Sequence, residues 1–234
     1  GQEATKGITG WTQIKEYQEG LEQIQAVRAP YESRIAEMSA KDILADEELR
    51  AYTQASSKVL FGDYCSACHG AGGAGGPNFP VLADDDWLWG GSVEEIEETI
   101  SNGHYGFMPA FKDTFTEQQL DDVASYVLSL SGHAADASAV ARGEQIFQTS
   151  EGGCYYCHTA AGTGLRSQGA ANLTDQIWTI ANVAETASAG EKQAAVKRVI
   201  ANGVERKMPG WSGRLTPTQI KLLTVYVHEL GGGQ

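Results

Sequence analysis

The chain contains the stretch Cys65-Ser66-Ala67-Cys68-His69, and the same pattern returns as Cys154-Tyr155-Tyr156-Cys157-His158. The spacing Cys-x-x-Cys-His is the attachment signature of c-type haem. Two thiols three positions apart on a helical turn can each add to one vinyl group of the same haem, and the histidine that follows can then bind the iron. The two stretches use all four cysteines of the 234-residue chain, so we expect two covalently attached haem c groups.

Three other uses of a cysteine pair fit these stretches less well. A structural zinc ion takes four ligands, usually from pairs that lie closer in sequence than these two. A thioredoxin-like redox pair stands beside a βαβ pattern, which this sequence lacks. Structural disulfides do not require a histidine directly after each pair. We therefore expect Cys65, Cys68, Cys154 and Cys157 to hold haem, with His69 and His158 as iron ligands.

Two of the three methionines precede a proline, at Met108 and Met208. Proline biases the residue before it towards extended backbone, and a methionine on an extended loop can reach across a haem edge. Its thioether is a soft iron ligand that raises the reduction potential. We expect Met108 and Met208 to be the second axial ligands, whereas Met38 lacks the proline and is expected to fill the core.

Three further histidines could compete for iron. His104 lies four residues before Met108 and is a rival axial ligand. His133 follows in a Gly/Ala-rich linker, and His228 falls in a predicted C-terminal helix. We favour packing or surface roles for all three.

The chain repeats itself beyond the haem motifs. Matching segments occur in the same order in both halves: 82–87 with 173–178, 100–103 with 200–203, and 116–120 with 216–220. Helices are expected at 49–62, 93–102, 139–149 and 191–202. Two closing helices are expected to begin after the N-caps Thr116 and Thr216 and to end at Gly132 and Gly231. No strand pattern competes, so the sequence predicts an all-α protein with one haem unit over residues 49–133 and another over 134–234.

Composition excludes several classes of function. The net charge is −13, and an acidic chain repels phosphate backbones, so nucleic acid is not an expected partner. The charge is uneven: residues 51–133 carry 2 Lys+Arg and 12 Asp+Glu, whereas residues 134–234 carry 9 and 8. An acidic first unit could steer a basic partner, although general solubility is an equal explanation. No apolar run is long enough to span a bilayer, so any export signal or anchor is expected outside this sequence.

The first 48 residues form a separate helical arm or linker. Apolar residues recur in it at steps of three and four, beginning at Ile14 and ending at Met38. Pro30 is expected to kink or split this helix. The apolar stripe needs a partner surface, and we expect it to dock on this chain rather than on another subunit.

These residues together resemble the dihaem subunit (CcoP/FixP-like) of cbb-type cytochrome c oxidases. The resemblance rests on the arm beginning Gly10-Trp11-Thr12, the haem motifs, the segment 86–92 with its Trp-Leu-Trp-Gly-Gly run, and Met108-Pro109-Ala110-Phe111. It implies two tandem class I cytochrome c domains, over 49–133 and 134–234, preceded by the helical arm of residues 1–48. It also implies a place on the periplasmic side of a bacterial inner membrane and an upstream membrane anchor.

The resemblance also implies a pairing of ligands. His69 and Met108 would bind the first iron, and His158 and Met208 the second. Class I domains often have a glycine four residues before an aromatic on the first helix, which Gly143 and Phe147 match, whereas Ser57 stands in its place in the first unit. A proline carbonyl often holds the proximal histidine, a role that Pro77 fits and for which Ala171 stands in the second unit.

The predicted function is electron transfer through the two haems to the catalytic core of a membrane-bound oxidase, without catalysis by this chain alone. The expected partners are the other oxidase subunits and a basic cytochrome c donor docking on the acidic first unit. A free periplasmic dihaem shuttle is the main alternative. A dihaem enzyme is another, and it would need one iron with an open or displaceable sixth position.

Overall fold

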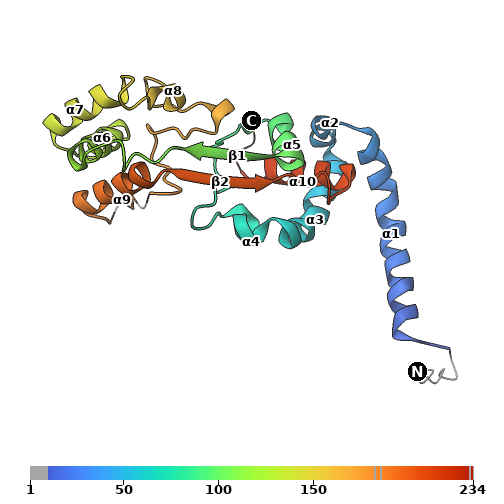
Figure 1. The fold of residues 1–234 in the computed structure, drawn as a ribbon. Helices are drawn as coiled ribbons and strands as arrows, with labels where there is room; N and C mark the ends of the chain where they lie inside the picture. Colours follow the sequence, from blue (N-terminus) through green and yellow to red (C-terminus); the bar gives the residue numbers. More distant parts are fainter. Residues whose placement is uncertain (1–9, 182, 185, 232, 234) are drawn as a thin grey trace.

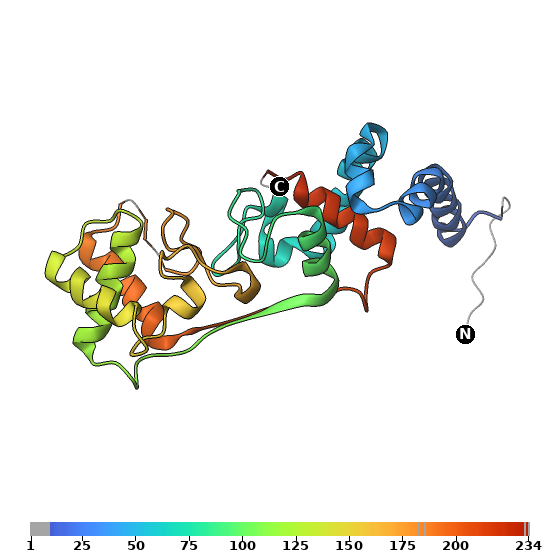
Figure 2. The same ribbon diagram turned by 90° about the horizontal axis from the view of Figure 1, so that it is seen from above.

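The computed structural model describes residues 10–181, 183–184, 186–231 and 233. The beginning of the predicted arm, residues 1–9, and positions 182, 185, 232 and 234 of the second predicted unit lie outside the described residues. The chain is mostly helical, as expected. It forms two lobes joined by a two-stranded ribbon, with one helix projecting from the first lobe (Figures 1 and 2).

The first lobe contains α2 (Ala40–Ala45), α3 (Glu47–Tyr64), α4 (Ser66–His69), α5 (Val93–Asn102) and α10 (Pro217–His228). The second lobe contains α6 (Glu117–Leu130), α7 (Ala137–Phe147), α8 (Tyr155–His158) and α9 (Ala189–Asn202). The predicted helix starts are confirmed: Thr116 and Thr216 each accept a hydrogen bond from the backbone N–H three residues on and complete capping boxes with Gln119 and Gln219.

The ribbon is a feature that the sequence reading missed. Strands β1 (Gly103–Met108) and β2 (Val204–Pro209) pair antiparallel, with His104 opposite Met208 and Met108 opposite Val204. Each strand is only six residues long and is half-exposed. Neither strand contains the run of buried β-branched residues from which a strand would be predicted. The expectation of an all-α chain without strands is therefore wrong in this detail.

The two closing helices do not close the units in which they were expected. Helix α6 packs against α7 and α9, and α10 packs against α3 and α5. The rings of Tyr126 and Phe147 lie 5.2 Å apart in the second lobe, and those of Phe61 and Tyr226 lie 5.3 Å apart in the first. The segments 1–48, 49–133 and 134–234 remain an interpretation of the repeated sequence, because in space each lobe takes its closing helix from the other repeat.

Most of the described part of the arm is one helix, α1 (Gln13–Glu37), and α2 follows it. Helix α1 continues through Pro30, so Pro30 does not split it. Only its C-terminal end docks on the first lobe. Ile35 is fully buried there, and Tyr31 and Met38 pack against the same apolar cluster, which confirms Met38 as core. Towards the N-terminal end, Ile14 and Tyr17 are 71% and 67% exposed. The expectation that the arm docks on this chain is thus confirmed for its C-terminal end and is wrong for the exposed stretch from Ile14 to Val27.

Candidate haem sites

In the first lobe, the Cys-x-x-Cys-His motif occupies the end of α3 and the single turn of α4. Cys65 caps α3, and the backbone N–H groups of Cys68 and His69 bond back to its carbonyl. The His69 imidazole donates from Nδ1 to the carbonyl oxygen of Pro80 at 3.3 Å. The sequence suggested Pro77 for this contact; Pro80 holds it because the glycine-rich loop folds back, with the N–H of Gly75 bonded to the carbonyl of His69.

The second lobe repeats this geometry. His158 donates from Nδ1 to the carbonyl oxygen of Ala171 at 2.9 Å, which confirms that a backbone carbonyl serves at the position suggested for it. The loop folds back in the same way, with the N–H of Gly164 bonded to the carbonyl of His158 at 2.9 Å. In both lobes the histidine Nε2 is consequently the unprotonated nitrogen that can bind a metal.

The pKa values in these motifs disfavour thiol redox chemistry and favour neutral histidines. None of the four cysteines is paired in a disulfide. Burial raises the pKa of Cys65 and of Cys154 to about 11, whereas a redox-active pair needs a lowered pKa. Burial also lowers the pKa of His69 and His158, which favours the neutral imidazole that ligates iron.

The two methionines lie in opposite lobes from those expected. Met208 packs against the cluster of Phe61, Ile100 and Tyr226 that also contacts Cys65. Met108 packs against the cluster that contains Phe147 and contacts Cys154. The pairing of Met108 with the His69 motif and of Met208 with the His158 motif therefore disagrees with the packing, because the ribbon carries each methionine across to the other lobe.

Buried donors without partners also fit a haem. Among the described residues, Trp178 Nε1 and Arg206 Nη2 are buried with no hydrogen-bond partner. Such orphaned donors are uncommon and indicate a missing acceptor. Trp178 packs against the same cluster as Cys154 and Met108, so a haem propionate could satisfy its N–H. The residues around Cys154 and His158 thus fit a haem.

The other histidines make packing contacts. His104 lies stacked on Trp89, with ring centroids 4.0 Å apart, and its Nε2 is 2.8 Å from the Thr99 hydroxyl, so it is already engaged. His133 lies near Trp178 and Lys192, and His228 lies beside Glu229. These contacts fit the packing roles favoured from the sequence.

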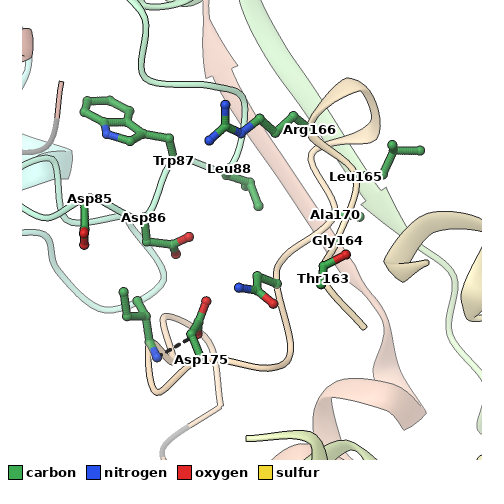
Figure 3. Close-up of a pocket in the computed structure, with 12 residues that line it drawn as sticks. Asp85, Asp86, Trp87, Leu88, Thr163, Gly164, Leu165, Arg166, Ala170 and Asp175 are labelled. Atoms are coloured by element: carbon green, nitrogen blue, oxygen red, sulfur yellow. Dashed lines mark hydrogen bonds between the residues drawn. The ribbon is translucent and has the colours of Figure 1, made fainter. Parts of the chain in front are cut away.

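The loops that follow the two haem motifs face each other across a hollow of about 280 Å³ between the lobes (Figure 3). One wall is formed by the segment Asp85–Leu88, and the other by residues around Arg166 and Asp175. Burial, together with Asp175 and Asp84, raises the pKa of Asp86 to about 6. This hollow marks where the haem-motif loops of the two repeats approach each other.

Comparison with known proteins places this architecture in a family. Residues 53–127 and 138–227 match the profile of "Cytochrome C oxidase, cbb3-type, subunit III". The chain belongs to this family. It is 41% identical to the cbb3-type cytochrome c oxidase subunit FixP of Azorhizobium caulinodans, over 98% of this chain and 78% of the relative.

Subunits with the other name in the family are similarly close. The CcoP subunit of Azospirillum sp. is 39% identical over all of this chain and 81% of its own length, and that of Cereibacter sphaeroides is 35% identical over 99% and 79%. The CcoP/FixP-like resemblance is confirmed. Within the described residues, no helix combines the length and the hydropathy needed to cross a bilayer.

Proposed function

We propose that this chain is the electron-transfer subunit of a cbb3-type cytochrome c oxidase and carries two haem c groups, one on each Cys-x-x-Cys-His motif. Electrons would enter one haem, pass to the other and leave for the oxidase core. The family and the names of the relatives support a cytochrome c that transports electrons as an oxidase subunit. We further propose that the two haems serve respiration.

One observation carries the proposal: the same constellation occurs in both lobes. Each lobe brings together two cysteines that form no disulfide, a histidine whose Nδ1 donates to a backbone carbonyl, and a methionine against the same apolar cluster. When bound, haem supplies a one-electron Fe(II)/Fe(III) couple. Each lobe offers one imidazole and one thioether, which would hold a haem iron from both sides and would leave no position for a substrate. This arrangement favours electron transfer over a dihaem enzyme.

The exposed face of α1 supports an oxidase subunit over a free shuttle. Large apolar side chains line the part of the helix that leaves the first lobe, and they are Ile14, Tyr17, Leu21, Ile24 and Val27. A contiguous exposed apolar surface of this kind marks an interaction site. We propose that the other oxidase subunits cover it, on the periplasmic side of a bacterial inner membrane.

A basic cytochrome c is the donor that the charge distribution favours. Residues 63–98 carry 8 Asp+Glu and no Lys or Arg, and they all belong to the first lobe and its loops. A surface of one sign accelerates encounter with a partner of the other sign, and salt weakens the effect. An association rate that does not change with ionic strength would argue against this docking.

The test of the main proposal is the visible spectrum and intact mass of the protein made in a haem-attaching host. We expect a mass that exceeds the polypeptide by two haems and a spectrum typical of low-spin six-coordinate c-type haem. Carbon monoxide should leave the reduced spectrum unchanged. Ready binding of carbon monoxide at one haem would favour an enzyme, and a colourless protein would refute the proposal.

A further inference from the structure

We propose that each haem is completed by the methionine of the other repeat: Met208 binds the iron held by His69, and Met108 binds the iron held by His158. The inference rests on the proposed function only in assuming that haem occupies both motifs. It makes the two sites mutually dependent, because neither repeat contains the full ligand set of its own haem.

The backbone beyond each methionine is anchored in the opposite lobe. After β1, the N–H groups of Phe111 and Lys112 donate to the carbonyls of Ile200 and Ala201, at 3.1 and 3.0 Å, at the end of α9. After β2, Trp211 and Ser212 donate in the same way to Ile100 and Ser101 at the end of α5, at 2.9 and 3.1 Å. These hydrogen bonds hold the loops after Met108 and Met208 in the opposite lobe, together with the closing helices that follow them.

The closing helices α6 and α10 cross the helices that precede the haem motifs, α7 and α3, at equivalent positions. In the second lobe, a Cβ at Gly143 of α7 would overlap the carbonyl oxygen of Asp122 in α6. In the first lobe, the hydroxyl of Ser57 in α3 donates to the carbonyl oxygen of Leu222 in α10 at 3.1 Å. Ser57 thus replaces glycine without loss of the helix crossing, and Asp122 and Leu222 are equivalent positions on the two closing helices.

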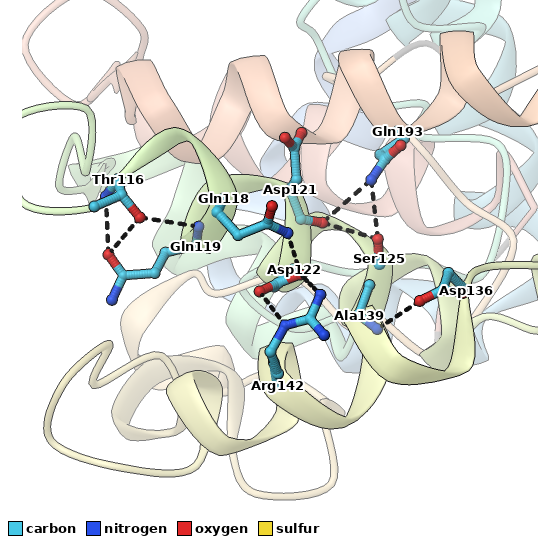
Figure 4. A network of polar contacts seen from close by, with 10 residues as sticks. All are labelled: Thr116, Gln118, Gln119, Asp121, Asp122, Ser125, Asp136, Ala139, Arg142 and Gln193. Atoms are coloured by element: carbon cyan, nitrogen blue, oxygen red, sulfur yellow. Dashed lines mark hydrogen bonds and ion pairs between the residues drawn. The ribbon is translucent and has the colours of Figure 1, made fainter.

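The charged side chains of the second lobe pair with α6, and Figure 4 shows Arg142 and Gln118 around the Asp122 carboxylate. Arg142 donates two hydrogen bonds to Asp122, at 2.8 and 2.7 Å, and Gln118 donates a third at 2.9 Å. Lys197 of α9 lies 2.8 Å from both Glu117 and Asp121. At the positions equivalent to Glu117, Asp121 and Asp122, helix α10 has Pro217, Lys221 and Leu222, none of which could pair with these cations.

The first lobe matches α10 for a complementary reason. Leu222 and Val225 are buried in the apolar cluster formed with Ile35, Ile43 and Leu49. Lys221 donates from Nζ to the carbonyl oxygens of Ile35 and Ala36 at the end of α1, at 3.2 and 2.9 Å.

Helix α6 offers different groups at those three positions, namely Asp121, Asp122 and Ser125. Closing the first lobe with α6 would bury an unpaired carboxylate in an apolar cluster and would set another carboxylate against carbonyl oxygens, and both arrangements are costly. It would also bring Glu97, the α5 counterpart of Lys197, beside Glu117 and Asp121. The side chains of the two closing helices therefore specify the exchanged arrangement.

Zero-length carbodiimide crosslinking of the full-length haem-loaded protein tests the exchange without altering the fold. We expect peptides joining Lys197 to Glu117 or Asp121 in the monomeric species, and their loss in Lys197→Gln. The link between Lys15 and Glu19, which lie 3.8 Å apart within α1, serves as the internal positive control. Absence of the Lys197 link while the control link forms, or its occurrence only in crosslinked dimers, would overturn the exchange within one chain.

The ligands themselves are assigned in chains that carry one haem. Cys154→Ser with Cys157→Ser leaves only the haem on Cys65 and Cys68. In that background we expect Met208→Ala to abolish the absorption band that marks thioether bound to ferric haem, and Met108→Ala to leave it. The mirror background, Cys65→Ser with Cys68→Ser, should reverse the two results.

The possible failures of this experiment are distinguishable. Loss of the band with Met108→Ala and not with Met208→Ala in the first background would refute the exchanged ligation while leaving the proposed function intact. A parent protein that carries fewer than two haems would refute the proposed function itself. If neither one-haem chain accumulates, the crosslinking result decides.

Discussion

The ion pair between Asp122 and Arg142 offers the sharpest energetic test of how the lobes are built. The two residues belong to different predicted units, and in the structure they join α6 to α7. A double-mutant cycle with Asp122→Asn, Arg142→Met and the double variant isolates their interaction energy. If each unit were closed by its own helix, the two side chains would lie in separate lobes and the interaction energy would be near zero.

The expected magnitude follows from the burial of the two side chains. The Asp122 side chain is 3% exposed, whereas that of Arg142 is 51% exposed. Breaking a fully buried pair costs about 3–5 kcal/mol, and exposed pairs are worth about 0.2–1 kcal/mol. With one partner buried and the other half in water, we expect an interaction energy of about 1.5–3 kcal/mol, the range for hydrogen bonds to charged groups. The more exposed pair of Lys197 with Glu117, at 24% and 84%, should give under about 1 kcal/mol.

The interaction should also depend on pH. The hydrogen bonds from the Arg142 guanidinium lower the pKa of Asp122 below its usual 3.8. A lowered pKa means that the pair stabilises the folded state fully above the unfolded value and loses this contribution as pH falls through the folded one. The interaction energy should therefore be constant from neutral pH to about pH 5 and should shrink below pH 4.

Denaturant titrations of the four haem-loaded proteins measure the cycle, with one common m-value as the condition for comparing their midpoints. Haem content determined for each variant is the control for correct maturation. An interaction energy below about 0.5 kcal/mol at pH 7, the scatter expected of independent sites, would refute the reasoning and with it the packing of α6 in the second lobe.

Three further outcomes follow from the same structure. Gly143→Ala should lower the thermal midpoint, because the added methyl group overlaps the α6 backbone at a cost of about 1–3 kcal/mol. The control Gly62→Ala adds a methyl group in open space on α3 and should raise the midpoint slightly. Equal midpoints for the two variants would contradict the close approach of α7 to α6. Asp86→Asn should stabilise the protein at pH 8, because the raised pKa of Asp86 means that its ionised form is disfavoured in the folded state. The gain in stability should decrease as the pH falls through about 6. A gain in calorimetry that does not change with pH would disprove the role of Asp86 ionisation. A protease site can be engineered between the exposed residues Ala134 and Ala135. After cleavage, both fragments should elute together under native conditions, because each lobe contains helices from both fragments. Separate elution would contradict the exchange.

Local chemistry in the sequence predicted much of each haem site. The Cys-x-x-Cys-His spacing is met within one helical turn, and the N-caps at Thr116 and Thr216 act within three residues, so neither depends on distant parts of the chain. The proximal carbonyl was predicted at Ala171 but misplaced at Pro77. The path of a glycine-rich loop depends on several positive-φ residues at once, and a sequence motif alone does not indicate where that loop returns.

The sequence by itself determined that there are two copies of a haem-binding pattern, which residues can bind iron, and where most helices begin. Only the tertiary structure decided which copy of the closing helix completes which lobe. The two helices share the same capping box and the apolar positions Leu120, Val123 and Val127 in α6 and Ile220, Leu223 and Val227 in α10, so periodicity cannot distinguish them. The choice depends on which side chains contact Asp122 and Leu222 across the helix interface. The buried carboxylate of Asp122 is stable where Arg142 donates hydrogen bonds to it, and it would be unstable against the apolar side chains of Ile35 and Leu49.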